Sequence, residues 1–217
     1  MVNEIDGIER IRFLTSHPKD CSDELIDAMA SLDKVCENIH LPFQSGSNKI
    51  LKDMHRVYTR EHYLELIRKL KEKVPNITLS TDIIVGFPGE TEEDFEDTLS
   101  MVEKVGYDQG FTFLYSIRKG TKAAEMQNQI PHEVKQERFQ RLIDSMYKIF
   151  YEKNKECLGQ TLEVLVEGIS KNNPDILTGR TRGYKLVHFK GGKRNIGQLV
   201  NVKITGHNSF ALEGEIV

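Results

Sequence analysis

Small hydroxyl residues, amides and glycines follow four apolar, strand-like segments of the chain. They are Thr15-Ser16-His17-Pro18, Gln44–Ser47, Gly86–Glu90, and Tyr115-Ser116 followed by Arg118. In parallel α/β sheets, ligands collect at the carboxyl ends of the strands, so these residues are candidates for one binding site. A connection that only reverses the chain needs nothing more than a turn. Because all four strand ends carry hydroxyl, amide or glycine residues, a binding site at these ends is favoured over plain turns.

The third segment, Gly86–Glu90, is a glycine-rich turn before a helix, a pattern typical of phosphate binding. Three acids, Glu92–Asp94, occupy the first turn of that helix and would repel a phosphate. We therefore expect a neutral or zwitterionic ligand, with Phe87 and Pro88 against a flat ring. Glu90 is either an acceptor for an amine or ribose hydroxyl, or a solvated acid near the helix start.

No catalytic or metal-binding group can be identified from spacing. No Ser–His–Asp arrangement and no close carboxylate pair is evident. Cys21, Cys36 and Cys157 are too scattered for a disulfide framework or a zinc site, so we interpret them as thiols in a reducing compartment. The sequence therefore predicts a binding surface with no catalytic residue and no metal ligand of its own.

Strand-like and helical patterns alternate from residue 10 to about 156. The predicted strands cover residues 10–16, 38–44, 77–85 and 111–116, and the longer predicted helices start near 22, 59, 91 and 132. Strand–helix units in succession predict a parallel sheet with right-handed crossovers. A barrel or part-barrel is the natural arrangement, and a doubly wound open sheet fits the same pattern.

After Gly159 the pattern changes to short alternating strands separated by glycines. Four strands are predicted, over residues 161–167, 184–190, 199–205 and 210–216. This pattern is typical of a small antiparallel β-barrel. We place the domain boundary near residue 157, with an α/β domain over residues 1–157 and a β-barrel over 158–217.

Charge is unevenly distributed along the 217 residues. Thirty basic and 33 acidic side chains give a net charge of −3, but residues 151–217 carry 10 bases and 7 acids. Lys171–Arg194 holds seven bases and one acid, which indicates a polyanion as partner. The chain shows no apolar run long enough to cross a membrane and no signal-peptide pattern, which predicts a cytoplasmic protein.

Several segments together resemble one enzyme family. They are Arg10–Pro18, His40–Ser47, Met54–Thr59, Thr81–Thr91 and Tyr115–Ala124. The chain resembles the C-terminal part of a methylthiotransferase of the radical S-adenosylmethionine (radical SAM) superfamily. Its tail, Leu165–Thr205, is similar to the family's RNA-binding TRAM domain. The resemblance implies the later strands of a half-open (βα) barrel, followed by an OB-like β-barrel.

The resemblance also implies an activity for the full-length parent. Gly179-Arg180-Thr181, with Val187, Phe189 and Gly191, favours the branch that modifies tRNA next to the anticodon. That branch methylthiolates carbon 2 of an isopentenyl-type adenosine. Relatives acting on threonylcarbamoyl-adenosine or on a ribosomal-protein aspartate are alternatives. An RNA-binding module on a non-catalytic α/β scaffold is an alternative of another class.

The family uses S-adenosylmethionine and two 4Fe–4S clusters, together with a sulfur donor and an electron donor. The CxxxCxxC run that holds one cluster is absent here, and Cys21, Cys36 and Cys157 match no cluster ligand. We therefore expect this chain alone to be inactive and to hold no cofactor tightly. A part-barrel would expose sheet edges, through which two copies could pair.

The resemblance assigns roles to residues of this sequence. The cofactor-binding candidates are Ser16, His17, Gln44, Ser45, Gly46, Ser47, Gly86, Phe87, Pro88, Gly89 and Glu90. The substrate-side candidates are Tyr115, Ser116 and Arg118. The RNA-binding candidates are Arg180, Arg182, Lys185, Lys190, Lys193 and Arg194.

Overall fold

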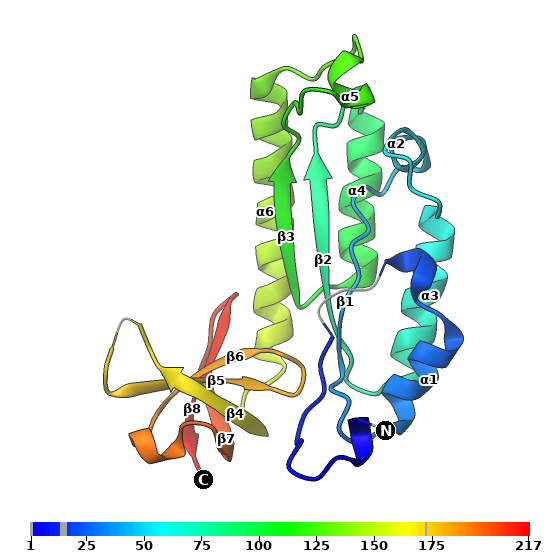
Figure 1. Ribbon diagram of the computed structural model, residues 1–217. Helices are drawn as coiled ribbons and strands as arrows, with labels where there is room; N and C mark the ends of the chain where they lie inside the picture. Colours follow the sequence, from blue (N-terminus) through cyan, green and yellow to red (C-terminus); the bar gives the residue numbers. More distant parts are fainter. Residues whose placement is uncertain (1, 14–16, 172) are drawn as a thin grey trace.

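Three parallel strands form the centre of the first part of the chain, in a computed structural model that describes residues 2–13, 17–171 and 173–217 (Figure 1). The strands are β1 (Asn38–His40), β2 (Thr78–Val85) and β3 (Gln109–Leu114), in the order β1-β2-β3. Both pairings are parallel. The predicted parallel sheet is confirmed.

Helices connect these strands and cover one face of the sheet. The α-helices are α1 (Asp23–Ser31), α2 (Asn48–Asp53), α3 (Arg60–Lys73), α4 (Glu92–Val105), α5 (Lys122–Glu125) and α6 (His132–Lys155). Short 3-10 helices are η1 (Val2–Glu4), η2 (Pro18–Asp20) and η3 (Lys193–Asn195). Leu79, Ile83 and Val85 of β2 are buried in a core with side chains of α3, α4 and α6.

The other face of the sheet is open. Successive residues of a strand point to opposite faces, so Asp82 and Ile84 lie opposite the buried Ile83. Phe111 and Phe113 of β3 are 55% and 51% exposed. His40 of β1 lies on the same face, because its ring contacts that of Phe111 at a centroid distance of 6.0 Å. The open face therefore combines polar and aromatic side chains.

Local signals place the helix ends. Thr91 caps α4, because its hydroxyl accepts a hydrogen bond from Asp94 N at 3.2 Å and Asp94 Oδ2 accepts one from Thr91 N at 2.9 Å. Gly106 ends the helix at φ 65°, a left-handed conformation that glycine adopts at little cost. The capping box and Gly106 thus mark the two ends of α4.

Two predicted strands are shorter than expected. In the described part of residues 10–16, only Ile11 pairs, through an isolated parallel bridge to Val35. The second strand pairs over Asn38–His40 and again in a single bridge between Gln44 and Ile83. Between these two places Phe43 N donates to the Thr81 side chain, and Gln44 N donates to the Asp82 carbonyl oxygen instead, so the pairing shifts by one residue.

The tail forms a closed barrel of five strands. They are β4 (Thr161–Ile169), β5 (Ile176–Thr181), β6 (Leu186–Lys190), β7 (Leu199–His207) and β8 (Ala211–Ile216), in the order β4-β5-β6-β8-β7. The prediction of four strands missed β5, and β6 pairs with β8 in parallel rather than antiparallel. Figure 1 shows the barrel at the end of the sheet opposite the β2 and β3 arrowheads.

Candidate functional site

A groove of about 480 Å³ lies at the carboxyl ends of β2 and β3. Its lining comprises Gln44, Met54, Arg56, Asp82, Ile84, Phe87, Phe113, Leu114, Tyr115, Ser116, Arg118, Thr121 and Ala123. Five of these were predicted from the strand ends: Gln44, Phe87, Tyr115, Ser116 and Arg118. The structure thus brings residues from three predicted segments into one groove.

The Gln44–Ser47 segment is held tightly against α4. Gln44 adopts φ 67°, which turns the chain at the end of the strand. Gly46 N donates a hydrogen bond to Thr98 Oγ1 at 2.9 Å, and a Cβ at Gly46 would lie 2.4 Å from the carbonyl oxygen of Asp97. Ser45 and Ser47 are buried. Only Gln44 of this segment lines the groove.

Helix α6 holds the Gly86–Glu90 turn in place through Arg138. Glu90 Oε1 accepts hydrogen bonds from Gly86 N at 3.1 Å and from Arg138 at 3.0 Å, and its side chain is 1% exposed. Burial raises the pKa of Glu90, although Gly86 and Arg138 both favour its charged form. The Glu90 carboxylate is thus buried and hydrogen-bonded within the protein, where it stabilises the turn.

Phe87 contributes the aromatic wall of the groove. Its ring packs edge-on against Tyr115 at a centroid distance of 5.2 Å. Pro88 is buried, and Gly89 N donates a hydrogen bond to Asn128 O at 2.9 Å. Phe87 and Tyr115 therefore line the groove, whereas Pro88, the other residue expected to face a flat ring, is not part of its lining.

Asp94 ties the first two loops together. Its carboxylate accepts hydrogen bonds from Ser47 Oγ at 2.6 Å, Lys49 Nζ at 2.5 Å and Thr91 N at 2.9 Å. Burial alone would raise the pKa of Asp94, but these donors outweigh burial and lower it to about 2. Lys49 also donates to Gly89 O at 2.8 Å. One carboxylate thus fixes the Gln44–Ser47 loop relative to the Gly86–Glu90 turn.

Two polar groups in the groove are buried without a hydrogen-bond partner in the described residues: Tyr115 Oη and Arg56 Nε. Arg56 also approaches His17 Nε2 at 3.5 Å, so His17 lies beside the groove rather than in its lining. Ser16, another cofactor-binding candidate, lies outside the described residues. A buried donor without a partner is costly, so these groups mark the groove as suited to a polar ligand.

Arg56 and Asp82 are groove residues that sequence analysis did not select. Asp82 stands within the apolar segment ITLSTDIIV, where a single acid opposite the buried positions signals a functional face. Arg56 follows a short helix and carries no comparable signal. Its position depends on the tertiary fold.

The cysteines lie in separate cores. Cys21 and Cys36 are buried in the sheet region, and Cys157 is buried with the tail barrel. Burial raises the pKa of Cys21 to about 11 and also raises the pKa of Cys157. Among the described residues, no group of three or more His, Cys, Asp or Glu side chains could hold a metal ion.

Two of the predicted RNA-binding residues hold the tail barrel against the sheet region. Arg182 forms hydrogen bonds with Glu37 at 2.8 Å and with the carbonyl oxygens of Asp33 and Val35. Lys185 Nζ contacts Asp108 Oδ1 at 2.7 Å and Asn154 Oδ1 at 2.9 Å, in a mostly buried pair. Their side chains face the seam between the two domains.

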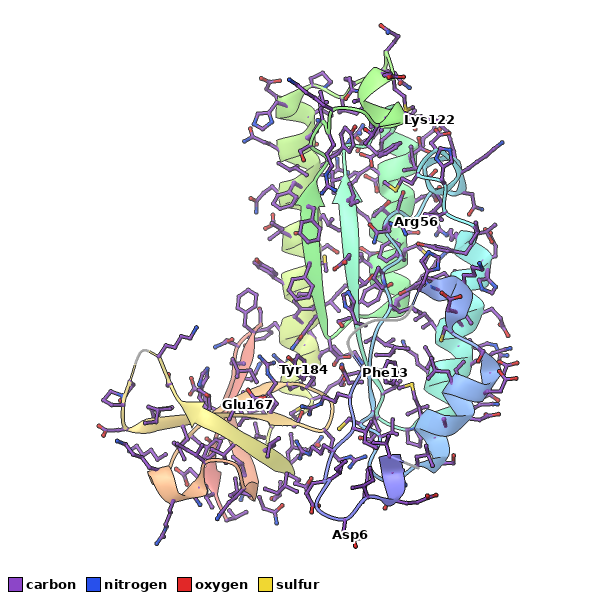
Figure 2. All side chains as sticks on the ribbon, in the orientation of Figure 1. Asp6, Phe13, Arg56, Lys122, Glu167 and Tyr184 are labelled. Atoms are coloured by element: carbon purple, nitrogen blue, oxygen red, sulfur yellow. The ribbon has the colours of Figure 1, made fainter. Side chains whose placement is uncertain are left out.

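Arg180 lies at the same seam, stacked on an aromatic ring. Its guanidinium carbon is 4.1 Å from the centroid of Tyr184, and that of Arg12 is 5.0 Å from it. Figure 2 shows Tyr184 between the tail barrel and the sheet region. Arg10 and Arg12 in turn donate to the carbonyl oxygens of Arg180 and Thr181. Arg10 and Arg12 thus attach the N-terminal segment to the tail barrel.

The other three predicted RNA-binding residues are free to meet a partner. Lys190, Lys193 and Arg194 are exposed at the end of β6 and on η3, and their side chains have no ion-pair partner within the described ranges. The tail therefore divides its basic residues between docking and an exposed basic surface.

Known proteins match both parts of the chain. Residues 1–102 match the radical SAM superfamily and residues 155–217 the TRAM domain. A tRNA-2-methylthio-N(6)-dimethylallyladenosine synthase from Finegoldia magna is 65% identical over 216 residues, covering 100% of this chain and 47% of that protein. The protein of the same name from Alkaliphilus oremlandii is 61% identical over 100% of this chain and 46% of its own length.

The chain thus spans about half the length of the curated relatives that it matches. The structure of coproporphyrinogen III oxidase from Escherichia coli, a radical SAM enzyme, superposes with a TM-score of 0.54 at 13% identity. That match covers 77% of this chain and 45% of the oxidase, and it supports the fold. No helix among the described residues is long and apolar enough to cross a bilayer. The chain is thus similar over its whole length to tRNA methylthiotransferases, with a radical SAM match in its first part and a TRAM match in its tail.

Proposed function

We propose that this chain is the part of a tRNA methylthiotransferase that carries one wall of the S-adenosylmethionine site and the RNA-binding barrel. The complete enzyme would methylthiolate carbon 2 of an isopentenyl-type adenosine beside the anticodon. The names of the relatives support this branch over the threonylcarbamoyl-adenosine and ribosomal-protein branches. We place this activity in the cytoplasm, where tRNA is modified.

The groove at the strand ends is the observation that carries the proposal. Its volume is in the range of small-molecule sites, which are roughly 300–1,000 Å³. Phe87 and Tyr115 offer aromatic faces to an adenine ring. The Tyr115 hydroxyl and Arg56 Nε, which have no hydrogen-bond partner among the described residues, offer hydrogen bonds. Gln44 and Ser116 add polar groups along the edge. These residues fit S-adenosylmethionine.

The cysteines of this chain do not fit an iron–sulfur cluster. A cluster needs several thiolates that converge, whereas Cys21 and Cys157 lie in different cores and have raised pKa values. In the superfamily, S-adenosylmethionine and an iron–sulfur cluster supply the radical chemistry. The residues described here would bind and orient the adenosine end of the cofactor. We expect weak S-adenosylmethionine binding by this chain alone.

The exposed basic surface of Lys190, Lys193 and Arg194 supports RNA binding by the tail. Neutralising RNA phosphates releases counterions, so binding should weaken steeply as salt rises. Arg182 and Lys185 would act indirectly by holding the barrel in place. The RNA-binding candidates thus separate into contacting residues and positioning residues.

Fluorescence anisotropy with a labelled anticodon stem–loop tests the proposal. We expect salt-dependent binding by the whole chain, weakened by K190Q/K193Q/R194Q. The control is K104Q/K148Q, which removes two exposed lysines, one from α4 and one from α6. Equal affinity of the triple variant and the wild-type chain at ~100 mM salt, where such contacts are only partly screened, would contradict RNA binding by this surface.

A further inference from the structure

The mouth of the groove carries a second group of basic side chains that form no ion pair with an acid of the described residues. We define the basic rim as Lys52, Arg56, Arg118, Lys119 and Lys122. Lys52 and Arg56 come from α2 and the loop after it, and the other three come from the β3–α5 connection and the start of α5. Arg56 and Arg118 line a hollow of about 480 Å³, and Lys52 and Lys122 line an adjoining one of about 710 Å³. Lys119 follows Arg118 in the chain and is exposed. Figure 2 shows Arg56 and Lys122 at this end of the sheet.

Basic residues on the outer helices are mostly neutralised. Arg60 pairs with Asp97, and Lys69 pairs with Asp23. In the basic rim, by contrast, no ion pair links any of the five residues to an acid of the described ranges. Two acids, Asp53 and Asp82, line the hollows, and Glu125 is exposed at the end of α5. The rim therefore keeps an excess of positive charge.

The tail barrel and the basic rim lie at opposite ends of the sheet. The barrel docks at the amino ends of the strands, whereas the groove lies at their carboxyl ends. β2 has eight residues, so the two ends are separated by about 26 Å at ~3.3 Å per residue. RNA bound only to the tail would leave its target nucleotide free to move over that distance. Contacts near the groove would restrict that motion.

We infer that the basic rim binds the phosphates of RNA beside the nucleotide that enters the groove, as a second contact separate from the tail barrel. This inference rests on the proposed function. Lysines hold phosphates as point charges, and arginines grip them with two hydrogen bonds. Two sites on one RNA also raise the effective concentration of the target at the groove.

The test uses the whole chain and K52Q/K122Q, which removes one charge from each wall of the same hollow. We expect an anticodon stem–loop to bind about 10-fold more weakly, with a salt slope smaller by about 1.4 for two lost single-strand contacts. K104Q/K148Q, which also removes two exposed lysines, should bind like the wild type. A stem without its loop should not distinguish K52Q/K122Q from the wild type.

Equal binding of the stem–loop by K52Q/K122Q and K104Q/K148Q would overturn the inference. If K190Q/K193Q/R194Q still weakened binding in that case, the proposed function would stand without the rim. If that triple variant also bound like the wild type, both would fail. K119Q changes an exposed rim residue with no side-chain partner in the described residues, and it should also weaken binding of the stem–loop. Thermal unfolding of each variant verifies that it folds.

Discussion

Arg138 and Glu90 form an ion pair whose side chains are 7% and 1% exposed. The pair links α6 to the turn that carries Phe87 into the groove. Arg138 also donates to Glu90 O at 3.1 Å and to Glu92 Oε2 at 3.1 Å. Arg138 carries no local sequence signal of this role, because its partners lie more than 40 residues away in the chain.

Replacing Arg138 with alanine should leave Glu90 buried and unpaired. We expect the free energy of unfolding to fall by about 3–5 kcal/mol, the cost of breaking a buried ion pair. R138A/E90Q should recover part of that loss, because it removes the uncompensated charge. Urea unfolding followed by circular dichroism measures both variants. A loss below about 1 kcal/mol in R138A would show that the pair does not hold the turn.

Asp94 should make stability depend on pH in acid. Its pKa of about 2 in the folded chain lies below the ordinary value of 3.8, so its contribution is present above pH 4 and is lost as the pH falls toward 2. We expect this contribution to be about 1–2 kcal/mol. The free energy of unfolding of D94N, measured in urea between pH 5 and 2, should lack this pH-dependent contribution. Parallel curves for D94N and wild type would contradict the pKa shift.

At the scale of the element, close packing fixes the Gln44–Ser47 loop on α4. A methyl group at Gly46 would meet the Asp97 carbonyl at 2.4 Å, and a backbone atom cannot move aside cheaply. We expect G46A to cost about 1–3 kcal/mol of unfolding free energy. G168A is the control, because nothing lies within 4 Å of its added Cβ. Equal stability of the two variants would refute the packing argument.

Elements with local signals could be predicted from sequence, and elements that depend on distant partners could not. The Thr91 cap, the Gly106 end and the length of α6 follow from neighbouring residues. The strand β5 carries a glycine and is only six residues long, so its pairing with β4 and β6 has no local signal. The groove residues Gln44, Phe87 and Tyr115 were predictable because strand ends meet at one edge of a parallel sheet.

At the scale of the whole molecule, the seam holds the tail barrel at a fixed place on the sheet region. Arg182 and Lys185 were predicted as RNA contacts from charge alone. Their engagement with Glu37 and Asp108 depends on residues 145 and 77 positions away, which charge patterning cannot reveal. A run of basic residues in a sequence does not distinguish docking from RNA binding.

Removing the Arg182 side chain should loosen this docking. We expect R182A to weaken it by about 1–3 kcal/mol, because several charge-assisted hydrogen bonds are lost. Hydrogen exchange at residues 33–37 and 181–185 should accelerate, whereas R194A, without a side-chain partner in the described chain, should leave it unchanged. Unaltered exchange in R182A would mean that other contacts suffice to hold the seam.

The most direct test of the account is a hydrogen-exchange footprint of an anticodon stem–loop on the whole chain. RNA bound by both the tail and the groove mouth should protect residues 190–194 and 118–122 in the same complex. Protection at the tail alone would confine RNA binding to the TRAM domain. Protection at neither segment, with the RNA bound elsewhere or unbound, would contradict the assignment of this chain to RNA recognition.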